Sequence, residues 1–164
     1  MALTVMDRFR PLRYLGSGGI PTLEVVKATA TTWSKGALIV SETGLAIQAA
    51  DSPVPTTILG IAAEPAVDGV LSALIIPALP GITFWGRMGT GGTGATYPTA
   101  IADRYLSGAG GYDIARGAVG VYYIDEGLTI APQAVILNFI DTMGTAWGAV
   151  EWTFASSAFN SVVA

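Results

Sequence analysis

Short apolar runs separated by turn residues recur along the chain and predict a mainly β protein. Strict alternation of apolar and polar residues over Val150–Phe154 predicts a half-buried strand. Nine further apolar-rich runs are bounded by Gly, Pro, Asp or Ser, as strands usually are. We expect these strands at 23–29, 37–40, 45–49, 57–63, 71–76, 82–85, 112–115, 119–125 and 133–141.

The best helix candidate is Thr99–Leu106, which follows Pro98 and ends before the glycine-rich stretch 108–111. Proline is favoured at the first turn of a helix, and glycine after its end. With turn signals every 8–12 residues or so, the pattern favours a small β-barrel or β-sandwich-like body over alternating strands and helices.

Three regions differ in character. Residues 1–22 show no sustained period and contain Pro11 and a Gly/Ser run at 16–19, which predicts an extended, flexible N-terminal arm. Residues 23–154 form the β-rich domain, and 155–164 are expected to be a C-terminal tail.

Targeting and membrane signals are not expected. The first residues show no basic stretch followed by an apolar run, so the sequence predicts no signal peptide. The longest apolar stretch, Val70–Trp85, is interrupted by Pro77, Pro80 and Gly81, so we expect no membrane partner.

Composition argues against most enzyme chemistry. The chain is 51% hydrophobic and only 12% charged, with no Cys and no His. This excludes thiol catalysis, disulfides, histidine-based triads and histidine-ligated metals. The carboxylates that remain include Asp51, Asp68, Asp103 and the adjacent pair Asp125 and Glu126. Adjacent residues on a strand face opposite sides, so we expect no catalytic site, no metal and no cofactor.

A glycine-rich motif is the one cofactor signal. Residues 89–94 match G-x-G-x-x-G, and Asp113 follows about 20 residues later, as in a dinucleotide-binding fold. That fold needs a helix whose N-terminus faces the pyrophosphate. Because Pro98 interrupts such a helix, we interpret the motif as a loop.

Charge is unevenly placed along the chain. Residues 1–36 hold five Lys or Arg and two acids, a net charge of +3, whereas residues 37–164 hold three Arg and ten acids, a net charge of −7. Either this is chance in a small sample, or a basic N-terminal segment docks on an acidic surface. Because an acidic body repels phosphate, we expect no nucleic-acid partner.

The aromatic residues have two interpretations. Trp and Tyr side chains, including Trp33, Trp85, Trp147 and Trp152, could form an exposed face that stacks on carbohydrate. They could instead fill the core and subunit contacts, which we favour because few other bulky residues are present.

Several segments together resemble one family. Their motifs are DRFRPLR at 7–13, WSKGALIV at 33–40, GLAIQAA at 44–50, TILGIAAE at 57–64, IIP at 75–77, TFWG at 83–86, GYDI at 111–114, VYYID at 121–125 and NFID at 138–141. This pattern is similar to the small capsid decoration (cement) proteins of tailed bacteriophages. The resemblance spans about residues 7–141, and the segment after Asp141 has no counterpart.

The resemblance implies a β-rich structural protein, usually a homotrimer, made in the host cytoplasm. Such proteins lie on the outer surface of the virion at three-fold and quasi-three-fold sites, where they clamp neighbouring major capsid protein subunits. The candidate capsid contacts are Arg8, Phe9, Arg10, Leu12, Arg13 and Tyr14. The alternative is a carbohydrate- or host-surface-binding β-domain of a head fibre or adhesin, which would need exposed aromatics such as Trp147 and Trp152.

Overall fold

The computed structural model describes residues 2–91, 111–117, 119–127, 132–155 and 157–159. The fold is mainly β, with 47% of the described residues in strands and 5% helical, and this confirms the predicted fold class. The expected helix at Thr99–Leu106 lies outside the described residues, as does most of the glycine-rich motif. No helix within the described ranges is long and apolar enough to cross a membrane.

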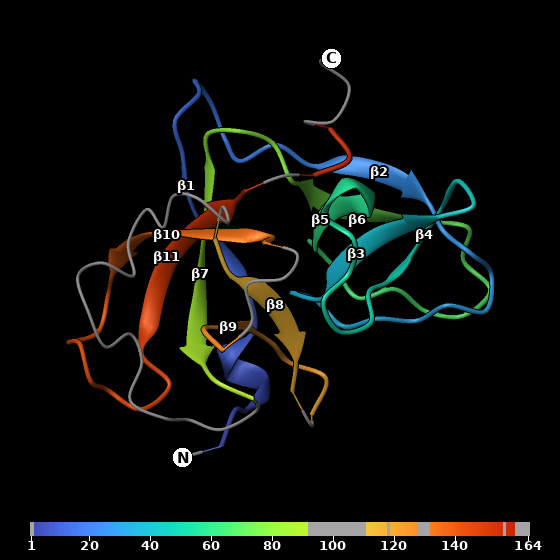
Figure 1. Cartoon of the computed structure of the whole chain (residues 1–164). Coiled ribbons are helices and arrows are strands. Elements are labelled where there is room, and N and C mark those ends of the chain that lie inside the picture. The colour runs from blue at the N-terminus through green and yellow to red at the C-terminus, as the bar shows by residue number, and fades with distance from the viewer. Residues whose placement is uncertain (1, 92–110, 118, 128–131, 156, 160–164) are drawn as a thin grey trace.

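The described strands form two sheets, which lie side by side (Figure 1). The first has the order β10-β11-β7-β9-β8, with β1 also paired to β7. All its pairs are antiparallel except β7 with β9. Its strands are β1 (Arg10–Tyr14), β7 (Ile82–Gly89), β8 (Asp113–Arg116), β9 (Tyr122–Asp125), β10 (Ala134–Phe139) and β11 (Ala149–Phe154).

The second sheet is antiparallel and has the order β2-β6-β5-β3-β4. A bridge between Lys27 and Ala46 brings the two edges of this sheet towards each other, so it curls in the manner of a small barrel. Its strands are β2 (Leu23–Val26), β3 (Leu38–Glu42), β4 (Leu45–Gln48), β5 (Ile58–Ala62) and β6 (Ser72–Pro77). Two short 3-10 turns, η1 (Val5–Asp7) and η2 (Pro55–Thr57), complete the described elements.

One continuous core joins the two sheets. Ile39, Ile61 and Ile75 of the second sheet belong to the same buried cluster as Phe84 and Trp152 of the first. Because protein interiors pack as densely as organic crystals, a shared core of this kind holds the two sheets as one body.

All ten predicted strands are present, with bounds shifted by a few residues. The half-buried character expected for residues 150–154 is wrong: Val150, Glu151 and Trp152 are all buried. The reason is that Val150 and Trp152 pack in the core, while the Glu151 carboxylate is covered by hydrogen bonds from Arg13 and Thr83.

The two ends of the chain are more closely packed than expected. Residues 10–14 are not a free arm, because they form β1 and pair with residues 82–85 of β7. In the expected tail, Ser157 is buried and its hydroxyl donates to the Ala78 carbonyl at 2.9 Å. Both segments therefore belong to the folded body over these residues.

Candidate functional site

The N-terminal segment, defined here as residues 4–15, begins with a closed turn. The Asp7 carboxylate accepts hydrogen bonds from the backbone N–H and the hydroxyl of Thr4, both at 2.9 Å. The Thr4 hydroxyl in turn accepts from the Met6 N–H at 3.3 Å. This reciprocal capping satisfies backbone groups that the short turn leaves unpaired, and it fixes the Asp7 carboxylate in place.

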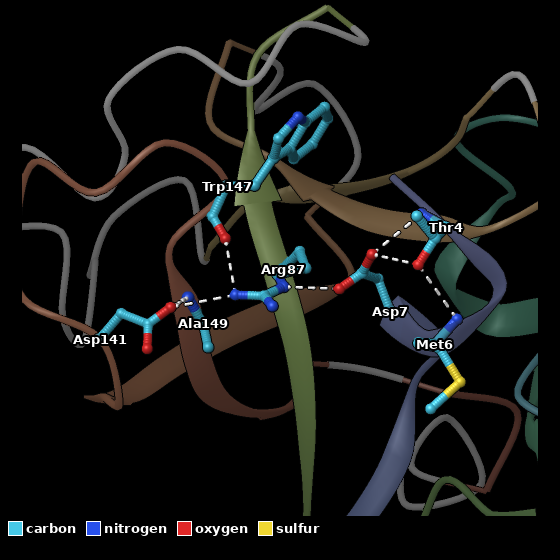
Figure 2. A network of polar contacts seen from close by, with 7 residues as sticks. All are labelled: Thr4, Met6, Asp7, Arg87, Asp141, Trp147 and Ala149. Atoms are coloured by element: carbon cyan, nitrogen blue, oxygen red, sulfur yellow. Dashed lines mark hydrogen bonds and ion pairs between the residues drawn. The ribbon is translucent and has the colours of Figure 1, made fainter. Parts of the chain in front are cut away.

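Arg87 of β7 fastens this turn to the rest of the sheet (Figure 2). Its Nε donates to Asp7 at 2.9 Å, and one terminal nitrogen donates to Asp141 at 3.0 Å and to the Trp147 carbonyl at 3.1 Å. Asp141 also accepts from the Ala149 N–H at 2.9 Å. One guanidinium thus joins the start of the chain to the turn that leads into β11.

The charge of Asp7 suits this arrangement. Burial on its own raises the pKa of this carboxyl, but hydrogen bonds from the Thr4 backbone, from Arg87 and from the Thr4 hydroxyl outweigh burial. The net effect is a pKa below the ordinary value, so Asp7 remains ionised and paired at neutral pH.

Phe9 anchors the segment in the core. Its side chain is 2% exposed, and its ring lies 4.7 Å from that of Trp152 and 6.4 Å from that of Tyr122. The ring packs on Gly86 so closely that a Cβ at this glycine would lie 2.6 Å from it. The segment is therefore held by aromatic contacts between Phe9 and residues of β9 and β11.

Arg13 fastens the other end of the segment. Its Nε donates to Glu151 at 2.7 Å and a terminal nitrogen donates to the second carboxylate oxygen, while Thr83 donates to Glu151 at 2.8 Å. The Arg13 hydrogen bond holds the pKa of the Glu151 carboxyl below its ordinary value, against the opposing effect of burial. The same contact raises the pKa of Arg13.

Of the six candidate contacts, four are engaged within the chain itself. Phe9 lies in the core, Tyr14 is half-buried against the core, Arg13 is paired with Glu151 and Arg10 stacks on the Trp85 ring. Arg10, Leu12 and Arg13 are exposed, and Arg8 is partly exposed. Capsid contact through the candidate side chains stays a prediction.

A groove of about 210 Å³ runs beside the start of the segment. Its lining combines apolar and basic side chains. Arg10 is held flat, with its guanidinium carbon 4.0 Å above the Trp85 ring. Neither Arg8, Arg10 nor Lys35 forms an ion pair with a described residue. The lining residues are Val5, Met6, Arg8, Phe9, Arg10 and Lys35.

Three leucines are exposed at the far end of the segment and in the turn before β7, and they are called here the Leu12, Leu15 and Leu79 patch. Their exposed fractions are 40%, 80% and 37%. Leu15 is held at the turn before β7 by a hydrogen bond from its N–H to the Gly81 carbonyl at 2.9 Å. Leu12 sits where the register between β1 and β7 shifts, which turns it out of the regular pairing.

The aromatic and acidic candidates lie elsewhere. Trp33, Trp85, Trp147 and Trp152 are all buried, so these four do not form the stacking face that a carbohydrate-binding domain would need. Asp125 is buried rather than solvated, with N–H groups of Gly91 and Gly127 donating to it. Across the described part of the chain, no group of three or more acidic side chains is placed to hold a metal.

Sequence reasoning missed three residues of this site. Arg87, Asp7 and Glu151 are polar residues whose partners lie 54 to 138 positions away in the chain. The only local signal was the Thr4–Asp7 spacing, which fits a capping box except that Asp replaces Glu. Comparison with protein-family models, with curated proteins and with solved structures finds no match.

Proposed function

We propose that this chain is a non-enzymatic structural protein of a phage head, which binds the outer surface of the capsid and stabilises the junctions between major capsid protein subunits. One observation carries the proposal: the N-terminal segment is fastened to the body at three points and yet displays apolar side chains to solvent. Leu12 and Leu15 are exposed, while Asp7, Phe9 and Arg13 of the same segment are engaged.

A fastened segment suits a clamp because its binding surface is ordered before the partner arrives. Ordering a loop or an interfacial side chain on binding costs free energy, and a preorganised surface reduces that cost. Exposed apolar residues next to one another are typical of interaction sites. The Leu12, Leu15 and Leu79 patch is therefore the part of the segment that we assign to the capsid.

The oligomeric state belongs to the same proposal. The resemblance to decoration proteins implies a homotrimer, and a symmetric oligomer multiplies weak contacts into a strong one. Sixteen large apolar side chains among the described residues are exposed, which leaves apolar surface for both subunit and capsid contacts. The buried tryptophans give the carbohydrate-binding alternative no comparable support.

The test uses substitutions on the patch, because a deletion of residues 2–16 would also remove Phe9 from the core. Leu12→Asp combined with Leu15→Asp is compared with a control, Val54→Asp combined with Val119→Asp, whose side chains are 61% and 56% exposed. Occupancy on isolated, expanded heads is measured by co-sedimentation. We expect the patch variant to lose most of its occupancy and the control to keep it. Equal occupancy for both would contradict the assignment of this patch.

A further inference from the structure

The basic groove at the start of the chain has a chemical complement on the same protein. Arg8, Arg10 and Lys35 surround it without an ion pair to any described residue, beside exposed Val5 and Met6. Unpaired cations beside apolar surface select an acidic segment that also carries apolar side chains.

Such a segment is the loop between β5 and β6, residues 64–71 (EPAVDGVL). Val67, Val70 and Leu71 are 59%, 45% and 62% exposed. Glu64 and Asp68 stand among them, exposed, and neither forms an ion pair with a described residue. The Glu64 carboxylate accepts a hydrogen bond from the Leu74 N–H at 3.1 Å, and the Asp68 carboxylate accepts one from the Gly69 N–H at 2.8 Å. These backbone contacts do not neutralise the two charges.

The loop is held in shape by the chain segment beneath it. Ala66 and Trp33 exchange two backbone hydrogen bonds, at 2.9 and 3.2 Å, and Gly69 donates to the Thr29 carbonyl at 3.2 Å. The buried Lys27 ammonium donates to three carbonyls of the supporting turn, those of residues 28, 29 and 31. The acidic, apolar loop is thus a preformed surface.

The loop and the groove are two distinct surface patches that lie near each other, because Ala66 of the loop pairs with Trp33, two residues before the groove residue Lys35. The loop follows β5 in the second sheet, whereas the groove is lined mainly by residues of the N-terminal segment that leads into β1 of the first sheet, together with Lys35. No described ion pair joins them within one chain. Two patches that complement each other without an ion pair inside one chain favour pairing between copies, either reciprocally about a two-fold axis or head to tail.

We propose that the 64–71 loop of one copy docks into the basic groove of a second copy. Glu64 and Asp68 face Arg8 and Lys35, and an apolar side chain of the loop packs against Met6, whose flexible thioether adapts to a partner. This is a contact between identical chains and does not involve the capsid. The experiment that tests it is therefore independent of the assignment of the Leu12, Leu15 and Leu79 patch to the capsid.

Charge reversal tests the pairing directly. The groove variant is Arg8→Glu with Lys35→Glu, the loop variant is Glu64→Lys with Asp68→Lys, and the third variant carries all four changes. Arg10 is left in place because it stacks on Trp85. Glu24→Lys with Glu42→Lys is the matched control, since both acids are exposed on other strands. Dissociation constants come from sedimentation equilibrium in low salt.

We expect the groove and loop variants each to associate at least about tenfold more weakly than the unmodified chain, as the loss of paired interfacial charges implies. The four-change variant regains the original oligomer mass, and the control is unaffected. A monomeric unmodified chain at tens of micromolar overturns the proposal. So does a four-change variant that fails to regain association while its circular dichroism and urea midpoint match the parent.

Discussion

Replacing Phe9 with alanine is the sharpest test of the claim that the N-terminal segment belongs to the fold. The side chain is 2% exposed and lies between the Trp152 and Tyr122 rings and Gly86. Truncating a buried phenylalanine removes its transfer free energy and leaves a cavity, which together cost about 3–5 kcal/mol. A domain of this kind has a total stability of about 5–15 kcal/mol, so the loss is a large fraction of it.

The assay is urea unfolding followed by tryptophan fluorescence, because Trp152 contacts the Phe9 ring. With a urea m-value of about 2 kcal/mol/M, the midpoint should fall by about 2 M. Leu12→Ala is the control in the same N-terminal segment, since Leu12 is 40% exposed, and it should change stability by no more than about 0.5 kcal/mol.

A Phe9→Ala midpoint within about 0.5 M of the parent would refute the reasoning, since it implies a loss of only about 1 kcal/mol. In that case the segment would be a free arm, as its composition alone suggests. The unfolding free energies of the two variants therefore separate an integral strand from a flexible terminus.

Three further predictions follow from the same contacts. Gly86→Ala should destabilise the protein by about 1–3 kcal/mol in urea unfolding, because the added Cβ would meet the Phe9 ring. Gly19→Ala is the control and should be nearly neutral, since no atom lies within 4 Å of the added Cβ. Equal effects of the two substitutions would contradict the packing of Phe9 on Gly86. Asp7 and Glu151 have lowered pKa values, so they stabilise the folded protein at pH values above their ordinary pKa values of 3.8 and 4.5, and this stabilisation is lost as the pH falls through and below those values. Glu151→Gln should therefore reduce the dependence of the unfolding free energy on pH in acid. An unchanged dependence would count against the pair of Glu151 with Arg13. Because all four tryptophans are buried, their fluorescence emission should be blue-shifted, poorly quenched by acrylamide and unchanged by added oligosaccharides. Strong quenching by acrylamide would support the carbohydrate-binding alternative instead.

The body could be predicted from sequence because its signals are local. Apolar runs between Gly and Pro turns mark every strand from β2 to β11. Strand β1 was not predicted, because Pro11 and the charged residues Arg10 and Arg13 interrupt any alternation of apolar and polar residues. A strand still forms there because proline is tolerated on a strand at the edge of a sheet.

Burial of polar groups could not be predicted from sequence in the same way. Glu151 is a polar position in a strictly alternating run, which predicts a side chain that faces solvent. It is buried instead, and its carboxylate is paired with Arg13, which lies 138 positions away in the chain. The orientation of Trp147 depends on a left-handed φ of 51°, which local propensity does not favour and which accompanies the hydrogen bond between its carbonyl and Arg87. The burial of Glu151 and the orientation of Trp147 depend on contacts between segments that are distant in the chain. The periodicity of apolar and polar residues carries no information about such contacts.

The central proposal is that this chain binds the outside of a phage capsid at subunit junctions. An electron cryomicroscopy map of expanded heads, with and without the purified protein, tests this most directly. The account predicts added density over the three-fold and quasi-three-fold junctions of the outer surface, with the Leu12, Leu15 and Leu79 patch against the capsid. Heads without added density, or with density only inside the shell, would contradict it.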